Sequence, residues 1–435
     1  MSTTSTAESP ATDRTAPLTF GQMSVWRDID SLPRDRWQEG NVFHTFALPE
    51  PVSRRQLCQA LTRLDAKHES LRTVYEVADP QRPRQRLLPP RPVTDVEVAA
   101  GPDAAERGTA LQNRPFDLTA DRQIRALGIA EGEPSEDPDE PNLIRVALCV
   151  HHIACDGWSL GLLMLDLFAF LGLAGEELPP APNSLLEVAE EQRSAPVWQA
   201  KLKATQRHFR LVYQAEVTSF RQRDPAVGVL QVALESHALL VAAQALADSA
   251  KVSVASVFTA AFLDAVSEQC EPGPIRIGLM TSNRFLDRWR NQVTTMNQLI
   301  PMVVQADPQA DFADRLASTQ VATMRAYRLG LFDVDQVTPH ALGLSVAPGR
   351  LSSLCMINTA NGAPPEYLAP EPAGQPPQLH WEPVFTAISA GCYLRVFLTT
   401  QESIRLRLRT GGLAREVTEA ILLSSYQRVL EAVAR

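Results

Sequence analysis

The hydrophobic residues of this chain follow the two-residue period of a strand first and the longer period of a helix next. Residues 40–50 (GNVFHTFALPE) alternate as a half-buried strand does. Residues 53–71 have a helical pattern behind Ser53, a residue type that caps helix N-termini. The positions that share one face of this helix are Leu57, Leu61, Leu64 and His68. The chain therefore opens with a strand and an amphipathic helix.

Two further apolar runs predict a hairpin of buried strands. Residues 122–131 and 143–150 are joined by an acidic loop, and the second run (LIRVALCV) is apolar at nearly every position. A strand that is covered on both faces has this composition. An apolar helix is predicted over 159–173, with Ser159 as its N-cap. Asp166 lies in the middle of that helix, where a charge opposes membrane insertion, so we expect a core helix rather than a membrane span.

A change of composition at 173–184 (LAGEELPPAPNS) separates two halves of similar size, and the alternation of strands and helices then starts again. The predicted helices of the second half are 185–212, 237–250, 253–270, 310–327 and 414–434, and its predicted strands are 227–235, 274–280, 353–360, 392–400 and 403–409. We therefore expect an α+β protein of two lobes. The expected parts are a disordered N-terminus (1–16), an N-terminal lobe (17–175), a linker (176–184), a C-terminal lobe (185–435) and, within it, a proline-rich crossover or lid (361–383).

Length, charge and cysteine content narrow the function without naming it. The 435 residues are enough for two hydrophobic cores, and the net charge of −9 argues against a nucleic-acid binder. The six cysteines are scattered and contain no CxxC pair, which predicts reduced thiols and a cytoplasmic protein. The N-terminal residues lack the apolar stretch of a secretory signal.

The densest polar chemistry follows the most apolar strand, in the segment 150–159 (VHHIACDGWS). Side chains alternate along a strand, so His151 and His152 point to opposite faces, and we expect no metal site here. An imidazole is a base near neutral pH, and a glycine before a helix start exposes backbone N–H donors that can stabilise an oxyanion. The segment therefore favours acyl-transfer chemistry. The alternative is a buried structural histidine beside an Asp-Gly turn.

The motif H-H-x-x-x-D-G with its trailing Trp and Ser resembles that of the condensation domains of nonribosomal peptide synthetases, within a superfamily that includes chloramphenicol acetyltransferase. Further stretches that resemble the family are 17–26 (PLTFGQMSVW), 67–73 (KHESLRT), 114–126 and 281–301. Two stretches depart from its pattern, 185–192 and 329–340. The resemblance implies two chloramphenicol-acetyltransferase-like lobes in a V-shaped pseudo-dimer, with a tunnel between them that contains the motif.

The resemblance also assigns roles to individual residues. It implies that His152 is the catalytic side chain and that Gly157 leaves room for a thioester. It makes His151 a structural residue and pairs Asp156 with an arginine of the other lobe, for which Arg284 is the candidate.

Three further residues have two readings each. Asn358 either faces the tunnel or is a turn residue at a strand end. Trp158 and Ser159 either line the substrate path or pack and cap the helix start.

The implied reaction transfers an acyl or aminoacyl group from a carrier protein to an amine or alcohol in natural-product biosynthesis. The carrier protein would supply the phosphopantetheine arm, so we expect no permanently bound cofactor, no membrane association and a monomer. The arginine-rich stretch 205–223 is the candidate docking surface for an acidic carrier. Three alternatives stay open: an acyltransferase that uses coenzyme A, a non-catalytic recruitment domain, and an epimerase of the same fold, whose aromatic and acidic tunnel signature is not evident in the sequence.

Overall fold

The computed structural model describes residues 14–173, 177–181, 183–305, 310–345, 353–361, 377–385, 391–398 and 403–433. Backbone contacts divide the chain into two compact units. Unit 1 contains residues 1–195 together with 284–296, and unit 2 contains 196–283 together with 297–435. A segment of the second half of the sequence therefore belongs to the first unit.

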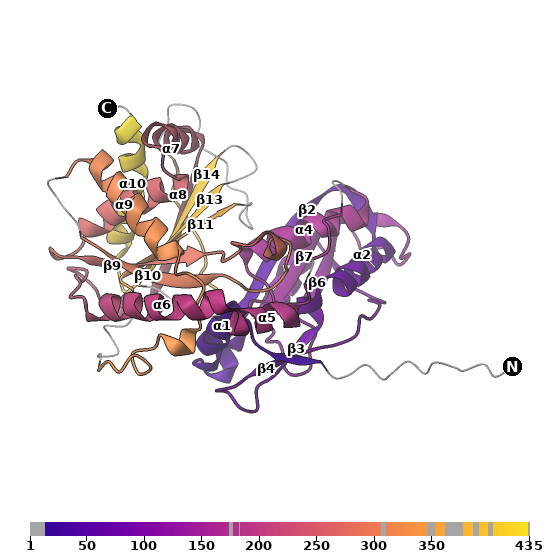
Figure 1. The fold of residues 1–435 in the computed structure, drawn as a ribbon. Coiled ribbons are helices and arrows are strands. Elements are labelled where there is room, and N and C mark those ends of the chain that lie inside the picture. The colour runs from indigo at the N-terminus through magenta and orange to yellow at the C-terminus, as the bar shows by residue number, and fades with distance from the viewer. Residues whose placement is uncertain are drawn as a thin grey trace. The chain divides into compact units, whose positions relative to one another are not determined.

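Unit 1 is an α+β unit with a four-stranded and a three-stranded sheet (Figure 1). The four-stranded sheet has the order β2-β7-β6-β5, with β2 (Asn41–Ser53), β7 (Pro141–His151), β6 (Ile124–Ala130) and β5 (Glu97–Ala100). The three-stranded sheet has the order β1-β4-β3, with β1 (Thr15–Pro17), β4 (Arg84–Leu87) and β3 (Thr73–Glu76). The predicted hairpin of β6 and β7 is confirmed, because the two strands pair antiparallel.

Four helices of unit 1, α1, α2, α4 and α5, begin at a capping side chain, whereas α3 follows Ala100 without one. Thr19 caps α1 and Ser53 caps α2, each through a capping box with a glutamine three residues later. The central strand β7 is buried at every position from 146 to 151, as its apolar composition predicts. The helices are α1 (Phe20–Asp30), α2 (Arg54–Lys67), α3 (Gly101–Asn113), α4 (Gly157–Leu171) and α5 (Leu185–Ser194).

Unit 2 is a seven-stranded sheet with the order β10-β9-β11-β13-β14-β8-β12. The strands are β8 (Val229–Ser236), β9 (Ile275–Thr281), β10 (Gln298–Val304), β11 (Cys355–Asn361), β12 (His380–Trp381), β13 (Cys392–Leu398) and β14 (Ile404–Gly411). The helices are α6 (Pro196–Gln214), α7 (His237–Ala250), α8 (Val254–Ser267), α9 (Phe312–Tyr327) and α10 (Arg415–Val433). Apolar side chains of α7, α8 and α10 share one large core with alternate residues of the sheet.

Several boundaries differ from those that the sequence predicts. The units separate between residues 195 and 196, beyond the predicted linker at 176–184, because α5 packs on β1 of unit 1. The predicted helix 185–212 is broken there, since Pro196 begins α6. Thr15 and Ala16 belong to β1, so order begins slightly before Pro17. Residues 1–13 and most of the predicted lid (362–376) lie outside the described residues.

The hydrophobic pattern of the sequence did not predict α1 and α3 in the first half of the chain or β10 in the second half. The buried residues of α1 include the polar Gln22, and α3 buries only Ala104 and Gly108, so neither sequence carries a strong apolar stripe.

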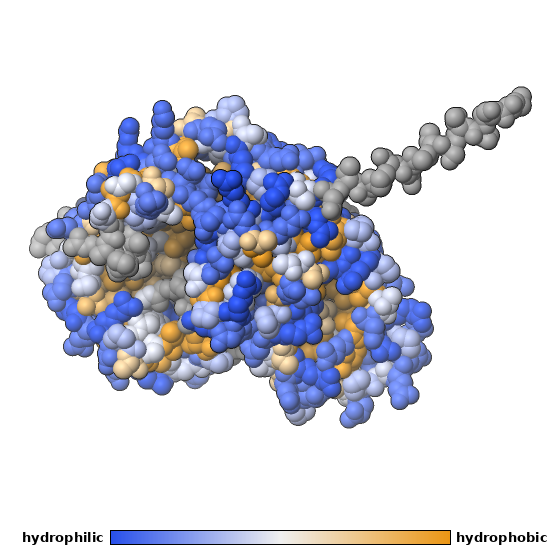
Figure 2. Space-filling model, turned by 90° about the horizontal axis from the view of Figure 1, so that it is seen from below, coloured by the Kyte–Doolittle hydropathy of each residue, from blue (hydrophilic) through white to orange (hydrophobic). Residues whose placement is uncertain are grey.

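No single helix in the described part of the chain is both long and apolar enough to cross a membrane. The bent pair α7 and α8, taken together, has sufficient length and apolar composition, but only by those two criteria. On the side drawn in Figure 2 the surface is mostly hydrophilic, with smaller hydrophobic patches between the polar residues. All six cysteines are buried and free of disulfides.

Candidate active site

The two histidines of the motif follow one another out of the central strand into the loop before α4. His151 ends β7, is fully buried, and accepts a hydrogen bond from the Ile153 N–H to its Nδ1 at 3.2 Å. Burial, with smaller contributions from the charges of His152 and Arg125, lowers the pKa of His151 to about 3. His151 is therefore a neutral residue that holds the loop.

His152 is half-buried and is held through its backbone on both sides. Its N–H donates to the Gly40 carbonyl at 2.7 Å. The Thr295 hydroxyl donates to the His152 carbonyl oxygen and lies 3.5 Å from the Nδ1 of the ring. The imidazole of His152 is thus anchored by residues far from it in sequence, while part of its surface remains accessible.

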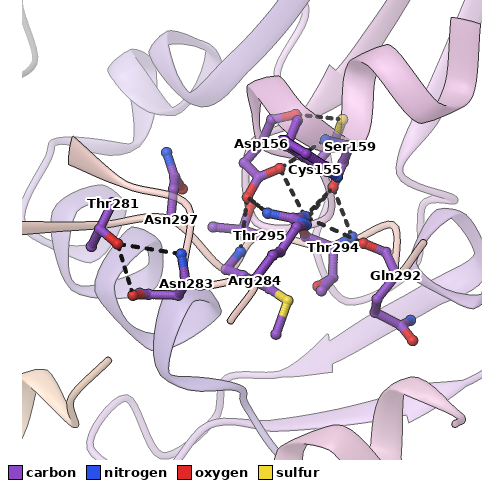
Figure 3. Close-up of polar contacts among 12 residues, drawn as sticks. Cys155, Asp156, Ser159, Thr281, Asn283, Arg284, Gln292, Thr294, Thr295 and Asn297 are labelled. Atoms are coloured by element: carbon purple, nitrogen blue, oxygen red, sulfur yellow. Dashed lines mark hydrogen bonds and ion pairs between the residues drawn. The ribbon is translucent and has the colours of Figure 1, made fainter. Parts of the chain in front are cut away.

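An ion pair fixes the start of α4 (Figure 3). The Arg284 guanidinium donates to both carboxylate oxygens of Asp156, at 2.7 and 3.0 Å, and both side chains are buried. Two parallel hydrogen bonds give a guanidinium–carboxylate pair a defined orientation. The structure therefore brings together the two residues that the resemblance paired. By contacts, however, Arg284 belongs to unit 1 with Asp156 and not to the other lobe.

Asp156 is the N-cap of α4, where its carboxylate accepts the Ser159 N–H at 2.9 Å and the Met296 N–H at 3.1 Å. Burial alone would raise the pKa of Asp156, but the charge and hydrogen bonds of Arg284, with the two backbone donors, hold it below its usual value. Asp156 is therefore an anion with a structural task at a helix N-terminus, where negative charge is favoured.

The predicted N-cap Ser159 is wrong, because Asp156 occupies that position and Ser159 lies inside the first turn. The Ser159 hydroxyl donates to the Thr294 carbonyl at 2.8 Å and accepts from Arg284 at 2.8 Å, and the residue is fully buried. Trp158 is half-exposed, and its indole N–H donates to the Arg290 carbonyl at 2.9 Å. Both residues join the helix start to the segment 284–296.

Gly157, the first residue of α4, is exposed, and a Cβ placed on it would meet no heavy atom within 4 Å. Space therefore lies directly beside this residue. The first N–H groups of a helix have no acceptor within it, and Asp156 accepts that of Ser159. The N–H groups of Gly157 and Trp158 precede that capped position at the same helix end.

Two glycines, Gly21 and Gly40, make the close packing around the loop possible. A Cβ at Gly40 would lie 2.8 Å from Nε2 of His151, and a Cβ at Gly21 would lie 2.5 Å from the Thr295 carbonyl oxygen. Gly40 carries no sequence signal beyond its residue type.

The segment 284–296 begins with a sharp turn at Asn283, which has a left-handed backbone (φ 55°). Asparagine tolerates this conformation better than most residues. Its side-chain amide donates to the Gly330 carbonyl at 2.9 Å. Its side-chain oxygen accepts from the Thr281 hydroxyl at 3.1 Å (Figure 3). This turn directs the chain into the segment that starts with Arg284, although the sequence around Asn283 shows no regular pattern.

The stretch KHESLRT supports α4 through side-chain contacts and is not part of the loop that carries His152. Lys67 and His68 both bind the buried Asp166 of α4, at 2.7 and 2.9 Å. Glu69 accepts the Leu185 N–H at the start of α5 at 2.7 Å. The Arg72 guanidinium donates to main-chain carbonyls of the same region. The stretch therefore holds the C-terminal half of α4 in place, through Asp166.

Asn358 lies in β11 of unit 2 and is half-buried. It is not a turn residue, because the strand continues through it and pairs it with Arg395 of β13. Within the described residues, no group of three or more His, Cys, Asp or Glu side chains could hold a metal ion.

Comparison with known structures identifies the fold. One similar structure describes condensation domain-mediated chain release from the enacyloxin polyketide synthase. It matches with a TM-score of 0.75 at 20% identity, over 98% of this chain and 84% of that one. The X-domain in complex with OxyB from teicoplanin biosynthesis matches with a TM-score of 0.71 at 18% identity, over 98% and 95% of the two chains. The chain therefore has the two-lobed α+β fold of condensation domains.

Sequence comparison gives the family. The model of the Condensation domain family matches residues 14–340, so the chain belongs to that family. The phosphinothricin tripeptide synthetase PhsC of Streptomyces viridochromogenes is 36% identical over 197 residues, which are 42% of this chain and 17% of that protein. The chain spans less than a fifth of the length of the first curated relatives that it matches.

Proposed function

We propose that this chain is a condensation enzyme that transfers an acyl or aminoacyl group from a carrier-protein thioester to an amine or alcohol. One observation carries the proposal: Thr295 anchors a half-buried His152 in the loop before α4, and Asp156 and Arg284 clamp the start of that helix, where open space lies beside Gly157. A histidine, a set of backbone donors and free space are what acyl transfer needs.

In the proposed reaction His152 accepts the proton of the attacking N–H or O–H as the nucleophile adds to the thioester carbonyl. The N–H groups at the start of α4, from Gly157 and Trp158, stabilise the oxyanion that forms. Collapse of the tetrahedral species breaks the C–S bond, and the leaving thiolate of the phosphopantetheine arm takes the proton from the imidazolium. An alcohol depends on His152 more than an α-amine does, because an α-amine with a pKa near about 8 is already partly neutral.

The basic surface of α6 supports a carrier protein as the donor. This helix of 19 residues contains no acidic residue, although the chain as a whole has a net charge of −9. Lys203, Arg207 and Arg210 are exposed on it, and neither Lys203 nor Arg207 forms an ion pair with a described residue. Such a surface complements an acidic carrier protein and steers its approach.

The test is single-turnover transfer from an acylated carrier protein to a panel of amines and alcohols, followed by mass spectrometry. The wild-type chain should form product with at least one acceptor class, and His152→Ala should slow it by about a hundredfold or more. His237→Ala, an exposed histidine of unit 2, is the matched control and should keep the wild-type rate. Product formation at the wild-type rate by His152→Ala would refute the proposal.

A transferase that uses coenzyme A is the first alternative. It would accept the same acyl group from a soluble thioester and would not need the basic face of α6. Equal or faster turnover with acyl-coenzyme A, compared with the acylated carrier, would favour this alternative.

A recruitment domain without activity is the second alternative, and the X-domain that binds OxyB has the same fold. Against it stands the intact set of His152, Asp156 and Gly157. Tight binding of a carrier protein without transfer in any acceptor panel would favour recruitment.

A further inference from the structure

One face of the unit 2 sheet carries arginine side chains instead of a hydrophobic core. Ile404, Leu406 and Leu408 of β14 point into the core with α7, α8 and α10. The residues that alternate with them along the strand point to the opposite face, because successive side chains of a strand point to opposite sides. These residues are Arg405, Arg407 and Arg409.

The strand register extends this face to the neighbouring strands. Arg407 lies opposite Arg395 of β13, and Arg395 lies opposite Asn358 of β11, so these three side chains form one row across the sheet. In the adjacent row Arg409 lies opposite Tyr393. We use the name arginine row for the residues of these two adjacent rows together, namely Asn358, Arg395, Arg407, Arg409 and Tyr393.

Acidic side chains on this face lie beside Arg405 and Arg407. Glu382 pairs with Arg405 and with Arg407, the latter at 2.6 Å, and Glu235 lies opposite Arg405 on β8. Burial lowers the pKa of Arg407; the charge of Glu382 opposes this effect, and those of Arg405 and Arg395 add to it.

Arg395 has an aromatic neighbour in place of a carboxylate. Its guanidinium carbon lies 5.0 Å from the ring centroid of Tyr393, and that of Arg409 lies 5.5 Å from the same ring. In the described part of the chain Arg395 forms no ion pair, and it is half-buried, so a ligand can reach it. A guanidinium oriented against a ring is prepared to bind a planar anion with two hydrogen bonds.

We propose that the arginine row binds an anionic group, a carboxylate or a phosphate, of a substrate of this protein. An anion there offsets the positive charge of the half-buried Arg395, and the Asn358 amide offers a further donor. That the ligand is a substrate rests on the proposed function. The carboxylate would belong to the amine or alcohol acceptor, whereas the phosphate would belong to the phosphopantetheine arm.

The test is calorimetric titration of the full chain with two matched pairs of probes, 4-aminobenzoate against 4-aminobenzamide and 4′-phosphopantetheine against pantetheine. The anionic member of at least one pair should bind about tenfold more tightly than its neutral counterpart. The pair that shows the preference identifies the source of the anion. Absence of a preference in both pairs would overturn the proposal.

Two variants locate the site. Arg395→Gln should abolish the preference for the anion, and Arg395→Lys should keep part of it, because the charge remains but the planar fork is lost. Arg325→Gln removes an exposed arginine of α9 and should bind as the wild type does. A preference that survives in Arg395→Gln would place the anion elsewhere and overturn the proposal.

Binding can be separated from transfer with His152→Ala, which should retain the anion preference because binding requires no proton transfer. If the wild-type chain binds the anion but forms no product, the proposed function fails while the anion site stands. If product forms and the anion preference is absent, the reverse holds.

Discussion

Arg284 and Asp156 lie 128 positions apart in the sequence and form a buried pair through two hydrogen bonds, at 2.7 and 3.0 Å. Removal of one partner leaves the other charge buried without compensation, which typically costs about 3–5 kcal/mol. We therefore expect Arg284→Met to lower the free energy of unfolding by about this amount in urea denaturation.

The matched control for this pair is Asp103 with Arg107, which has the same chemistry at 2.7 Å but is exposed on α3. Asp103→Asn should cost at most about 1 kcal/mol. A loss for Arg284→Met as small as that of the control would show that the buried pair does not stabilise the helix start.

Gly157 offers a test that separates room for substrate from stability. A methyl group there meets no protein atom within 4 Å, and alanine in a helix usually stabilises a protein relative to glycine by about 0.4–1 kcal/mol. Gly157→Ala should therefore melt at the same temperature as the wild type or higher, and yet lose at least about tenfold in transfer rate. Gly161→Ala, which is equally uncrowded in the same helix, should keep the rate. Equal rates in both variants would remove Gly157 from the substrate path.

Thr295 is expected to position His152 without touching the substrate. Thr295→Val removes the hydroxyl that binds the His152 carbonyl, a loss of about 1 kcal/mol, or about fivefold in kcat. Thr295→Ser should restore the rate, and KM for the acceptor should stay unchanged. A change in KM alone, measured in steady-state kinetics, would contradict a positioning role.

His151 makes stability depend on pH. Its pKa falls to about 3 on folding because the neutral ring is buried, against about 6.5 in the unfolded chain. The contribution is complete above pH 6.5 and is lost progressively as the pH falls toward 3. At pH 5 the expected loss is about 2 kcal/mol. Urea denaturation at pH 7 and pH 5 measures it.

A variant without the imidazole supplies the comparison for this pH dependence. His151→Gln should show a smaller decline between the two pH values, whereas the exposed His237→Gln should decline as the wild type does. Identical declines in all three proteins would assign the effect to other groups.

The basic face of α6 is testable through salt. Arg207→Glu should raise KM for the acylated carrier protein by about three- to tenfold at low ionic strength, because it repels an acidic partner. Arg325→Glu, the same change on α9, should have a smaller effect, and high salt should remove the difference. Equal effects of the two changes would exclude α6 as the docking surface.

Local pattern was sufficient where one element buries one face. The two-residue alternation of β14 and the helical spacing of α2 and α7 follow from the need to bury apolar side chains, so they could be predicted within a few residues. The motif chemistry could also be found, because His152, Asp156 and Gly157 are close in sequence. The prediction failed at Ser159, because both Asp156 and Ser159 are good caps and the contacts that Asp156 makes with Arg284 and the Met296 N–H come from a distant segment.

By itself the sequence determined the alternating α+β elements, the strand–loop–helix unit that carries His152, and the buried character of β7. The tertiary structure alone decided that residues 284–296 belong to unit 1, that Thr295 anchors His152, and that Gly21 and Gly40 must lack side chains. It also decided that Asn358 and four arginines share one sheet face. The reason is physical: periodicity records which side of an element is buried, whereas these contacts join residues of distant segments whose approach no local pattern encodes.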